Sequence, residues 1–199
     1  MTTISELVQR AAVALIAMIG TSTASGFADA EEPFKVEIEA LRQSLAKYQD
    51  VYTAVREGYF STVGCVHYDG HKMEGHVEYQ KGAMGVHFIN TSLIGTTPDP
   101  LRPPILVYEP KDGQLHLVGV EWFVPVAPGV KRPVLFDQPF LGPMEGHVPI
   151  LPKEFVHYDL HAWFKENPYG TFAPTNPNVS CEGYDFSLLE QPTRIVPEQ

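Results

Sequence analysis

Within residues 155–164, apolar and polar side chains alternate from Val156 to Ala162, a period of two that is typical of a β-strand. On such a strand the polar members share one face, and they are His157, Asp159 and His161. These side chains can bind a metal ion or transfer a proton. If this face lines a cavity, it indicates a metal or catalytic site, and if it faces water, the segment is an ordinary amphipathic strand.

Residues 33–58 are predicted to form one long amphipathic helix. Apolar side chains recur there and just beyond at alternating steps of four and three, namely Phe34, Ile38, Leu41, Leu45, Tyr48, Tyr52, Val55 and Tyr59. Pro33 suits the first turn of a helix, and Gly58 can end it. We expect this apolar stripe to pack on a sheet, although it could also seed a coiled coil.

Beyond the helix the sequence favours β structure. Strands are expected at residues 84–89, 105–109, 114–124 and 155–164, with a weaker edge segment at 133–140. The 18 prolines and 16 glycines favour short elements joined by turns. The predicted fold class is α+β, mainly β: an antiparallel β-barrel or sandwich with the long N-terminal helix packed against it. One globular domain, 31–199, would hold a β-rich part at 60–165 and an ordered C-terminal loop at 166–199.

Residues 1–30 resemble an export signal. Arg10 precedes a short apolar run, and Ala28-Asp29-Ala30 fits the small-x-small pattern of signal peptidase. A buried helix or a retained membrane anchor is the alternative. We therefore expect an exported protein, periplasmic or extracellular, without stable membrane insertion after cleavage. The formal net charge of -10 argues against nucleic acid as a partner and favours cations.

The chain contains two cysteines, Cys65 and Cys181. In an oxidising compartment, the simplest interpretation is a disulfide that ties the start of the domain to its tail. The alternative is a free Cys65 that binds a metal beside His67.

Three further residues carry ligand-type side chains in apolar or loop surroundings. His87 lies in a short apolar strand, and His147 follows a loop rich in glycine and proline. Glu121 lies in a strongly apolar run, where an unpaired carboxylate is costly to bury. If Glu109 pairs with Gln114 across a turn at 110–113, Glu121 shares a face with the inward residues Leu106 and Tyr108. The alternatives are a core histidine, a surface histidine and a glutamate at an exposed strand end.

Strand geometry limits which residues can share an ion. Residues four apart on a strand lie about 13 Å apart and residues two apart about 6.6 Å, so His157 and His161 should have different roles. The predicted metal ligands are His87, Glu121, His147 and His161, with His157 and Asp159 as alternatives or as groups that orient the ligands. This mixture suits Zn, Fe, Mn or Cu and disfavours Ca or Mg. A second polar cluster is expected to be an exposed loop, and it comprises His67, Asp69, His71, Glu74 and His76.

Several longer motifs stand out: MGVHFIN at 84–90, LVGVEWFV at 117–124, HYDLHAW at 157–163 and NPxxxFxPxNPxVxC at 167–181. With these motifs the chain resembles a family of exported, mostly bacterial proteins of unassigned function. The resemblance implies an exported single domain and supplies no reaction or cofactor. The His and Glu set is also similar to that of cupins, but the His-x-His of cupins is missing here, so that assignment is not carried over.

Three functions follow from these features. The first is a secreted metal-binding β-barrel protein, which could be a metalloenzyme with a transition metal bound by His and Glu. The second is a non-catalytic module that binds a small apolar ligand, with pocket residues Tyr108, Phe123 and Trp163. The third is an extracellular structural or interaction protein whose aromatics are core and whose histidines are solvated. The sequence leaves open whether the protein is an enzyme, which oligomeric state it adopts and which of these functions it has.

Overall fold

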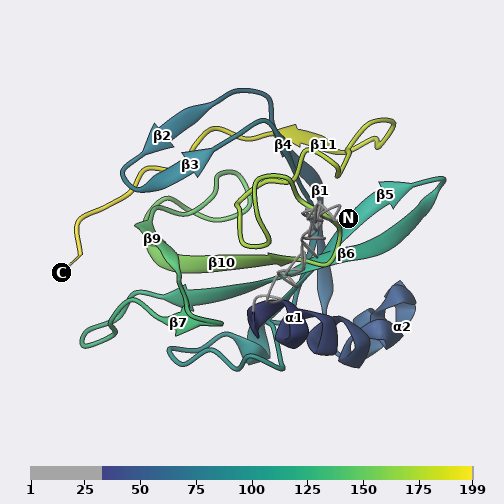
Figure 1. The fold of residues 1–199 in the computed structure, drawn as a ribbon. Coiled ribbons are helices and arrows are strands. Elements are labelled where there is room, and N and C mark those ends of the chain that lie inside the picture. Colours follow the sequence, from purple (N-terminus) through teal and green to yellow (C-terminus); the bar gives the residue numbers. More distant parts are fainter. Residues whose placement is uncertain (1–32, 199) are drawn as a thin grey trace, which may run out of the picture. The chain divides into compact units, whose positions relative to one another are not determined.

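The structure is a computed structural model that describes residues 33–198, and most of its elements are strands (Figure 1). Seven strands form one sheet in the order β11-β1-β4-β5-β6-β10-β9. Their bounds are β1 Phe60–Tyr68, β4 Gly82–Ile89, β5 Ile105–Lys111, β6 Gln114–Pro125, β9 Leu141–Met144, β10 His157–Trp163 and β11 Ser187–Leu189. The mainly β class is confirmed. The sheet curls as a half-barrel, which corrects the predicted barrel or sandwich.

The C-terminal tail links the two edges of this sheet. At one edge β11 pairs in parallel with β1, and at the other edge residues 194–196 run beside β9. There the Glu145 amide donates to the Arg194 carbonyl at 3.0 Å, and the Val196 amide donates to the Pro143 carbonyl at 2.8 Å. The segment expected to be a loop therefore contains a strand and spans the opening of the half-barrel.

The single long helix predicted at 33–58 is wrong. The chain forms α1 (Pro33–Ser44), a 3-10 turn η1 (Ala46–Gln49) and α2 (Val51–Arg56). The Ser44 hydroxyl donates to the Leu41 carbonyl where α1 ends, and Asp50 caps α2 by accepting from the Tyr52 amide. The apolar stripe also changes face, because Tyr52 is 74% exposed whereas Ala54 is fully buried.

The helical segment packs on β5 and β6, as expected for its buried half. The Tyr108 hydroxyl donates to the Tyr48 carbonyl at 2.7 Å. Gln49 exchanges two hydrogen bonds with the backbone of Leu117. In Figure 1 the helices lie together beside these strands. One face of the sheet is therefore covered by helix, and the other face is left to form a separate interior.

The turn between β5 and β6 uses two residues, Asp112 and Gly113. Both have positive φ, 53° and 73°, which is the conformation of a type I′ hairpin turn. Lys111 therefore pairs with Gln114, and the predicted pairing of Glu109 with Gln114 is wrong. The prediction assigned four residues to a turn that needs only two.

A bulge between Val107 and Tyr108 shifts the pairing again further along β5. Glu121 pairs with Ile105, so it shares a face with Ile105 and not with Leu106 or Tyr108. That face lies opposite the helices. Glu121 is nevertheless buried, with 5% of its surface exposed. It was predicted to be buried on the face that carries Leu106 and Tyr108, and it is buried on the opposite face of the sheet.

Gly85 changes the alternation of β4. It has a φ of 84°, and β1 and β4 pair with a register shift at this point. Residues three apart on a regular strand point to opposite faces, yet Met84 and His87 both line one cavity. A glycine in the left-handed region can form such a bulge, and a Cβ at Gly85 would lie 2.6 Å from the Tyr108 carbonyl oxygen.

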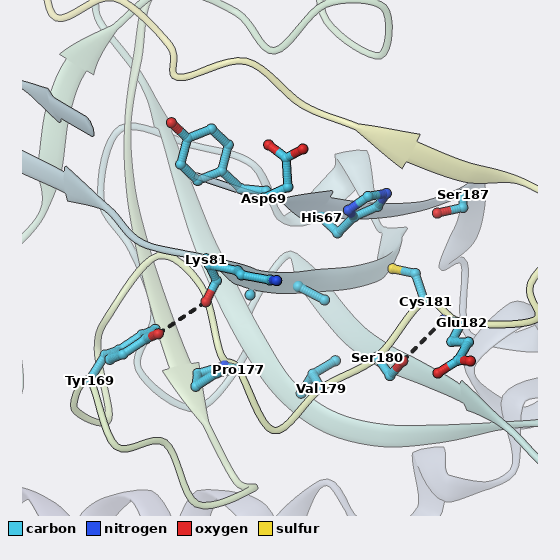
Figure 2. A pocket seen from close by; sticks show the side chains of 13 residues that line it. His67, Asp69, Lys81, Tyr169, Pro177, Val179, Ser180, Cys181, Glu182 and Ser187 are labelled. Carbon is cyan, nitrogen blue, oxygen red and sulfur yellow. Dashed lines mark hydrogen bonds between the residues drawn. The ribbon is translucent and has the colours of Figure 1, made fainter. Parts of the chain in front are cut away.

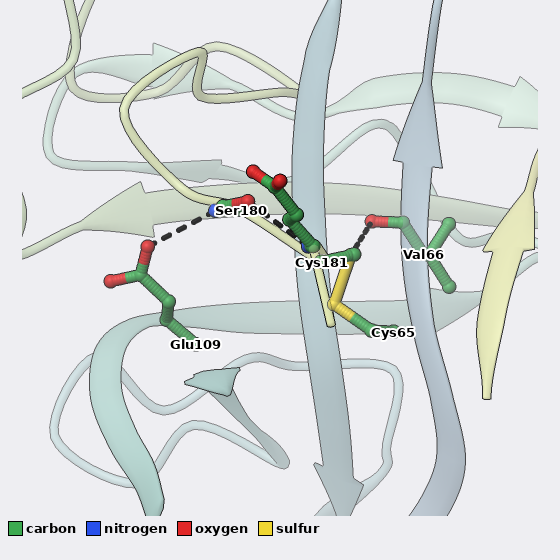
Figure 3. The surroundings of a disulfide bond; sticks show 6 residues. Cys65, Val66, Glu109, Ser180 and Cys181 are labelled. Atoms are coloured by element: carbon green, nitrogen blue, oxygen red, sulfur yellow. Dashed lines mark hydrogen bonds between the residues drawn. A yellow bond between two sulfur atoms is a disulfide. The ribbon is translucent and has the colours of Figure 1, made fainter. Parts of the chain in front are cut away.

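Cys65 and Cys181 form the predicted disulfide, which joins β1 to the tail (Figure 3). Beside it the buried carboxylate of Glu109 accepts from the Ser180 amide at 3.0 Å and from Lys165 Nζ at 2.7 Å. The disulfide and this ion pair hold the tail where it leaves the sheet.

Two regions expected as a loop and as an edge strand form small hairpins instead. Residues 67–68 end β1, and residues 72–74 form β2 (Lys72–Glu74), which pairs with β3 (Val77–Tyr79). Asp69, His71 and His76 lie in the connecting segments and are exposed, as predicted for a loop. Residues 133–140 contain β7 (Val134–Leu135) and β8 (Gln138–Pro139), and η2 (Thr91–Leu93) follows β4.

In residues 33–198 none of the helices combines the length and apolar character needed to cross a bilayer. The predicted signal at 1–30 lies outside the described residues.

Candidate metal-binding cavity

A cavity of about 650 Å³ opens on the sheet face away from the helices. It is bounded by β1, β4, β6 and β10, by the loop after β9 and by β11. Its ionisable lining residues are His87, Glu121, His147, Asp159, His161 and Glu190. The polar face of the strand at 157–163 therefore looks into a cavity and not into water, and every residue of β10 is buried.

Two groups of ligand-type atoms converge in this region of the described chain. We call the first the Glu121 group, which comprises His87, Glu121 and His161. The second is the Asp159 group, which comprises His147, His157 and Asp159. His147 was predicted to share a site with His87, Glu121 and His161, and the structure places it in the other group. His157 and His161 fall in different groups, as strand spacing predicted.

In the Asp159 group all three ligand atoms lie within 4 Å of one another. His147 Nε2 lies 3.2 Å from His157 Nε2, and Asp159 Oδ2 lies 3.7 Å and 3.9 Å from these two nitrogens. In the plane of the three atoms, the point equidistant from them lies about 2.1 Å from each. Zinc bonds to nitrogen and oxygen are roughly 2.0–2.2 Å long. The three atoms are thus spaced as ligands of one ion.

Other residues orient the two imidazoles of the Asp159 group. Nδ1 of His147 lies 2.5 Å from Glu190 Oε1 and 3.0 Å from the Thr193 hydroxyl. Nδ1 of His157 donates to the Phe155 carbonyl at 3.2 Å. Each Nε2 is therefore left to face the site. A carboxylate or a carbonyl on the far nitrogen is the usual support of a metal-binding histidine.

The Glu121 group has fewer contacts that orient its histidines. Glu121 Oε2 lies 3.2 Å from His87 Nε2 and 3.7 Å from His161 Nε2. His161 is 3% exposed, and within residues 33–198 neither of its ring nitrogens has a hydrogen-bond partner. Its ring stacks on Trp163, with the ring planes 12° apart. Burying an imidazole without a hydrogen-bond partner costs free energy. A ligand, an ion or water bound to His161 would offset that cost.

The charges in the cavity follow from these contacts. Burial would lower the pKa of His147, but Asp159 and Glu190 beside it raise the pKa to about 10. Burial and the charge of His147 lower the pKa of His157. Burial would raise the pKa of Glu121, but the neighbouring imidazoles of His161 and His87 lower it to about 2. Without metal, a charged His147 therefore donates from Nε2 to a neutral His157.

The aromatic residues predicted for a ligand pocket lie in different places. Phe123 lines the cavity, and its ring stacks on His157 with centroids 4.3 Å apart. Tyr108 is on the helix-covered face. Trp163 donates from Nε1 to the Ala173 carbonyl and supports His161.

Glu190 and Thr193 were not predicted. They lie in the tail, in a stretch without regular periodicity, and 43 and 46 residues separate them from His147 in sequence. Only the position of the tail across the opening of the half-barrel brings them to the site. The chain offers no local pattern that would have identified them.

A second hollow, of about 420 Å³, lies beside the disulfide (Figure 2). His67, Asp69 and Glu182 line it, and the Tyr169 hydroxyl donates to the Lys81 carbonyl across it. No three ligand-type atoms converge there within the described part of the chain. Of the predicted polar cluster, His71 forms an exposed hydrogen bond with Glu78 at 2.8 Å.

No protein-family model matches the chain, and neither a curated protein nor a solved structure is significantly similar to it.

Proposed function

We propose that this is an exported metal-binding protein that holds one transition-metal ion in its cavity on His147, His157 and Asp159. The observation that carries the proposal is the spacing of the three ligand atoms, 3.2, 3.7 and 3.9 Å. Export is supported by the signal-like sequence at 1–30 and by the disulfide, a bond typical of oxidising compartments.

Zinc suits two imidazoles and one carboxylate, and iron, manganese and copper accept the same donors. His147 and Asp159 both line the cavity, so the ion would face open space on that side. Three protein ligands with one free position are the arrangement of catalytic zinc sites, whereas structural sites are closed by four. This supports a site that takes a further ligand, and we assign no reaction to it.

The ion is placed in the Asp159 group because its imidazoles are already oriented. Pre-oriented ligands lose less entropy on binding, and the ring nitrogens of His161 in the Glu121 group have no hydrogen-bond partner within residues 33–198 that would orient them. The Glu121 group would take a second ion with lower affinity, or none.

Calorimetric titration of zinc into metal-free, untagged protein tests the proposal. We expect one tight site per chain, and Asp159→Asn should weaken it at least about 100-fold because a charged ligand is lost. Glu121→Gln should leave the tight site within a few-fold of wild type. Asp137→Asn, in an exposed turn where Asn is tolerated, is the matched control.

Two outcomes would overturn this assignment. One is the absence of uptake of zinc, iron(II), manganese(II) or copper(II) by folded protein. The other is loss of the tight site in Glu121→Gln with retention in Asp159→Asn, which would move the ion to the other group.

The second candidate function is a metal-free module for an apolar ligand. It is favoured by the lining of the cavity, where apolar side chains outnumber polar ones, and Phe123 lies among them. Mass spectrometry of an organic extract of the native protein would detect such a ligand. A bound molecule in protein that takes up no metal would favour this function over the first.

A further inference from the structure

Six of the residues that line the cavity are ionisable, and most of the others are apolar. Glu121, Asp159 and His161 are nearly inaccessible, at 5%, 3% and 3% exposed, whereas 21% of the His147 side chain is exposed. Among its described lining residues none is Lys or Arg, so a phosphate or sulfate group would find no lysine or arginine to pair with. A polar group that reaches these residues would be recognised by the ion of the proposed function, on which this inference rests, or by the imidazoles.

The rest of the wall is apolar. Side chains from β1, β4, β5, β6 and β11 and from the loop after β9 contribute to it, and they include Val66, Met84, Ile105, Phe123, Leu151 and Leu188. An apolar cavity of this size suits a ligand whose body is hydrophobic. A small polar molecule would leave most of this surface uncovered.

The rim of the cavity is apolar as well as exposed. Phe60, Val148, Phe155 and Leu189 line the cavity and keep 52%, 55%, 42% and 51% of their surfaces in water. They come from four separate segments: β1, the loop after β9, the residues just before β10, and β11. Large apolar side chains gathered at a cavity mouth indicate a site whose ligand covers them.

We propose that the cavity binds an amphiphile, a small molecule with one metal-binding head and an apolar chain. The head lies at the Asp159 group, and the chain runs along the apolar wall and covers the rim. The buried charges and the exposed apolar rim set this direction, because the opposite one would place the chain on carboxylates and leave the head among phenyl rings.

Alkyl hydroxamates test the inference, because the head binds metal and the chain length can be varied. Acetohydroxamate and octanohydroxamate are titrated into zinc-loaded protein, together with acetamide and octanamide, which share the chains but lack the chelating head. We expect octanohydroxamate to bind at least about 100-fold more tightly than acetohydroxamate, because six further methylene groups leave water.

Rim variants locate the chain. The double variant Phe60→Ala, Phe155→Ala should weaken octanohydroxamate about 10-fold or more and leave acetohydroxamate unchanged. Phe186→Ala is the matched control, since Phe186 is 59% exposed and does not line the cavity. Both variants alter exposed side chains, so both should remain folded.

The outcomes separate the inference from the proposed function. Equal affinity for the short and long members of both series would overturn the inference, whether or not zinc binds. Equal effects of the rim variant and of Phe186→Ala would overturn it too. If octanamide binds far more tightly than acetamide in protein that takes up no zinc, the apolar chain site stands and the metal-binding function fails.

Discussion

At the scale of single residues, the chemistry depends on which nitrogen of each histidine is free. Glu190 and the Phe155 carbonyl occupy Nδ1 of His147 and His157, so Nε2 of both rings faces Asp159. His161 has the same donor atoms without a partner among the described residues. Identical side chains on one strand face are therefore prepared for different tasks by their neighbours.

Glu190→Gln tests the orienting contact. The variant keeps the size of the side chain but removes the charge next to His147, so zinc affinity should fall about 10- to 100-fold with the fold unchanged. Isothermal titration calorimetry measures the affinity, and circular dichroism checks the fold. Glu182→Gln, on the same tail and exposed, should bind zinc like wild type. Equal affinities in all three proteins would show that Glu190 does not support His147.

Glu121 predicts a pH dependence of stability in chelator-treated protein. Its pKa is about 2 in the folded state against an ordinary 4.5, so its contribution is complete above pH 4.5 and is lost as the pH falls towards 2. The difference corresponds to at most about 3 kcal/mol. Urea unfolding of wild type should weaken across this window more steeply than that of Glu121→Gln. Parallel curves for the two proteins would contradict the prediction.

At the scale of elements, short-range patterns predicted strands well and the helix poorly. The alternation in residues 155–164 survives as β10, because a period of two is a property of the strand itself. The apolar steps in 33–58 look continuous, yet Ser44 and Asp50 offer local hydrogen bonds that end one helix and start another. The register of β5 and β6 failed for a related reason, since the turn length and a bulge decide it.

The loop that carries His147 makes a prediction at this scale. A Cβ at Gly146 would overlap the Pro152 carbonyl, so Gly146→Ala must displace the loop. Zinc affinity should fall at least about 10-fold, because a misplaced ligand loses its geometry. Gly95→Ala is the control, since a Cβ there has nothing within 4 Å. Zinc titration of both variants is the measurement, and unchanged affinity in Gly146→Ala would show that the loop adapts.

At the scale of the described domain, the tail makes the site possible. The tail crosses from β1 to β9 and supplies Glu190 and Thr193 on the way. The disulfide fixes its start, and a closed loop with a sequence separation of 116 restricts the unfolded chain strongly. Fold stability and the orientation of the candidate ligand His147 are thus connected through one C-terminal segment.

The double variant Cys65→Ser, Cys181→Ser tests this role. Its free energy of unfolding should be about 2–5 kcal/mol lower than that of the oxidised protein, because its unfolded chain is less restricted. Urea titration measures the change. A reducing agent should lower the stability of wild type and leave the double variant as it is, since the chain has only these two cysteines. Equal unfolding midpoints would contradict the prediction.

The sequence by itself determined the mainly β class, the strand at 155–164, the pairing of its only two cysteines and the separate positions of His157 and His161. Each of these depends on neighbours a few residues away or on residue types too few to combine in another way. Only the tertiary structure shows that Asp159 and His161 of β10 face a cavity, and that the ligand-type residues around it divide into two groups. Those facts depend on strand order, register and the path of the tail, which bring together residues more than forty positions apart.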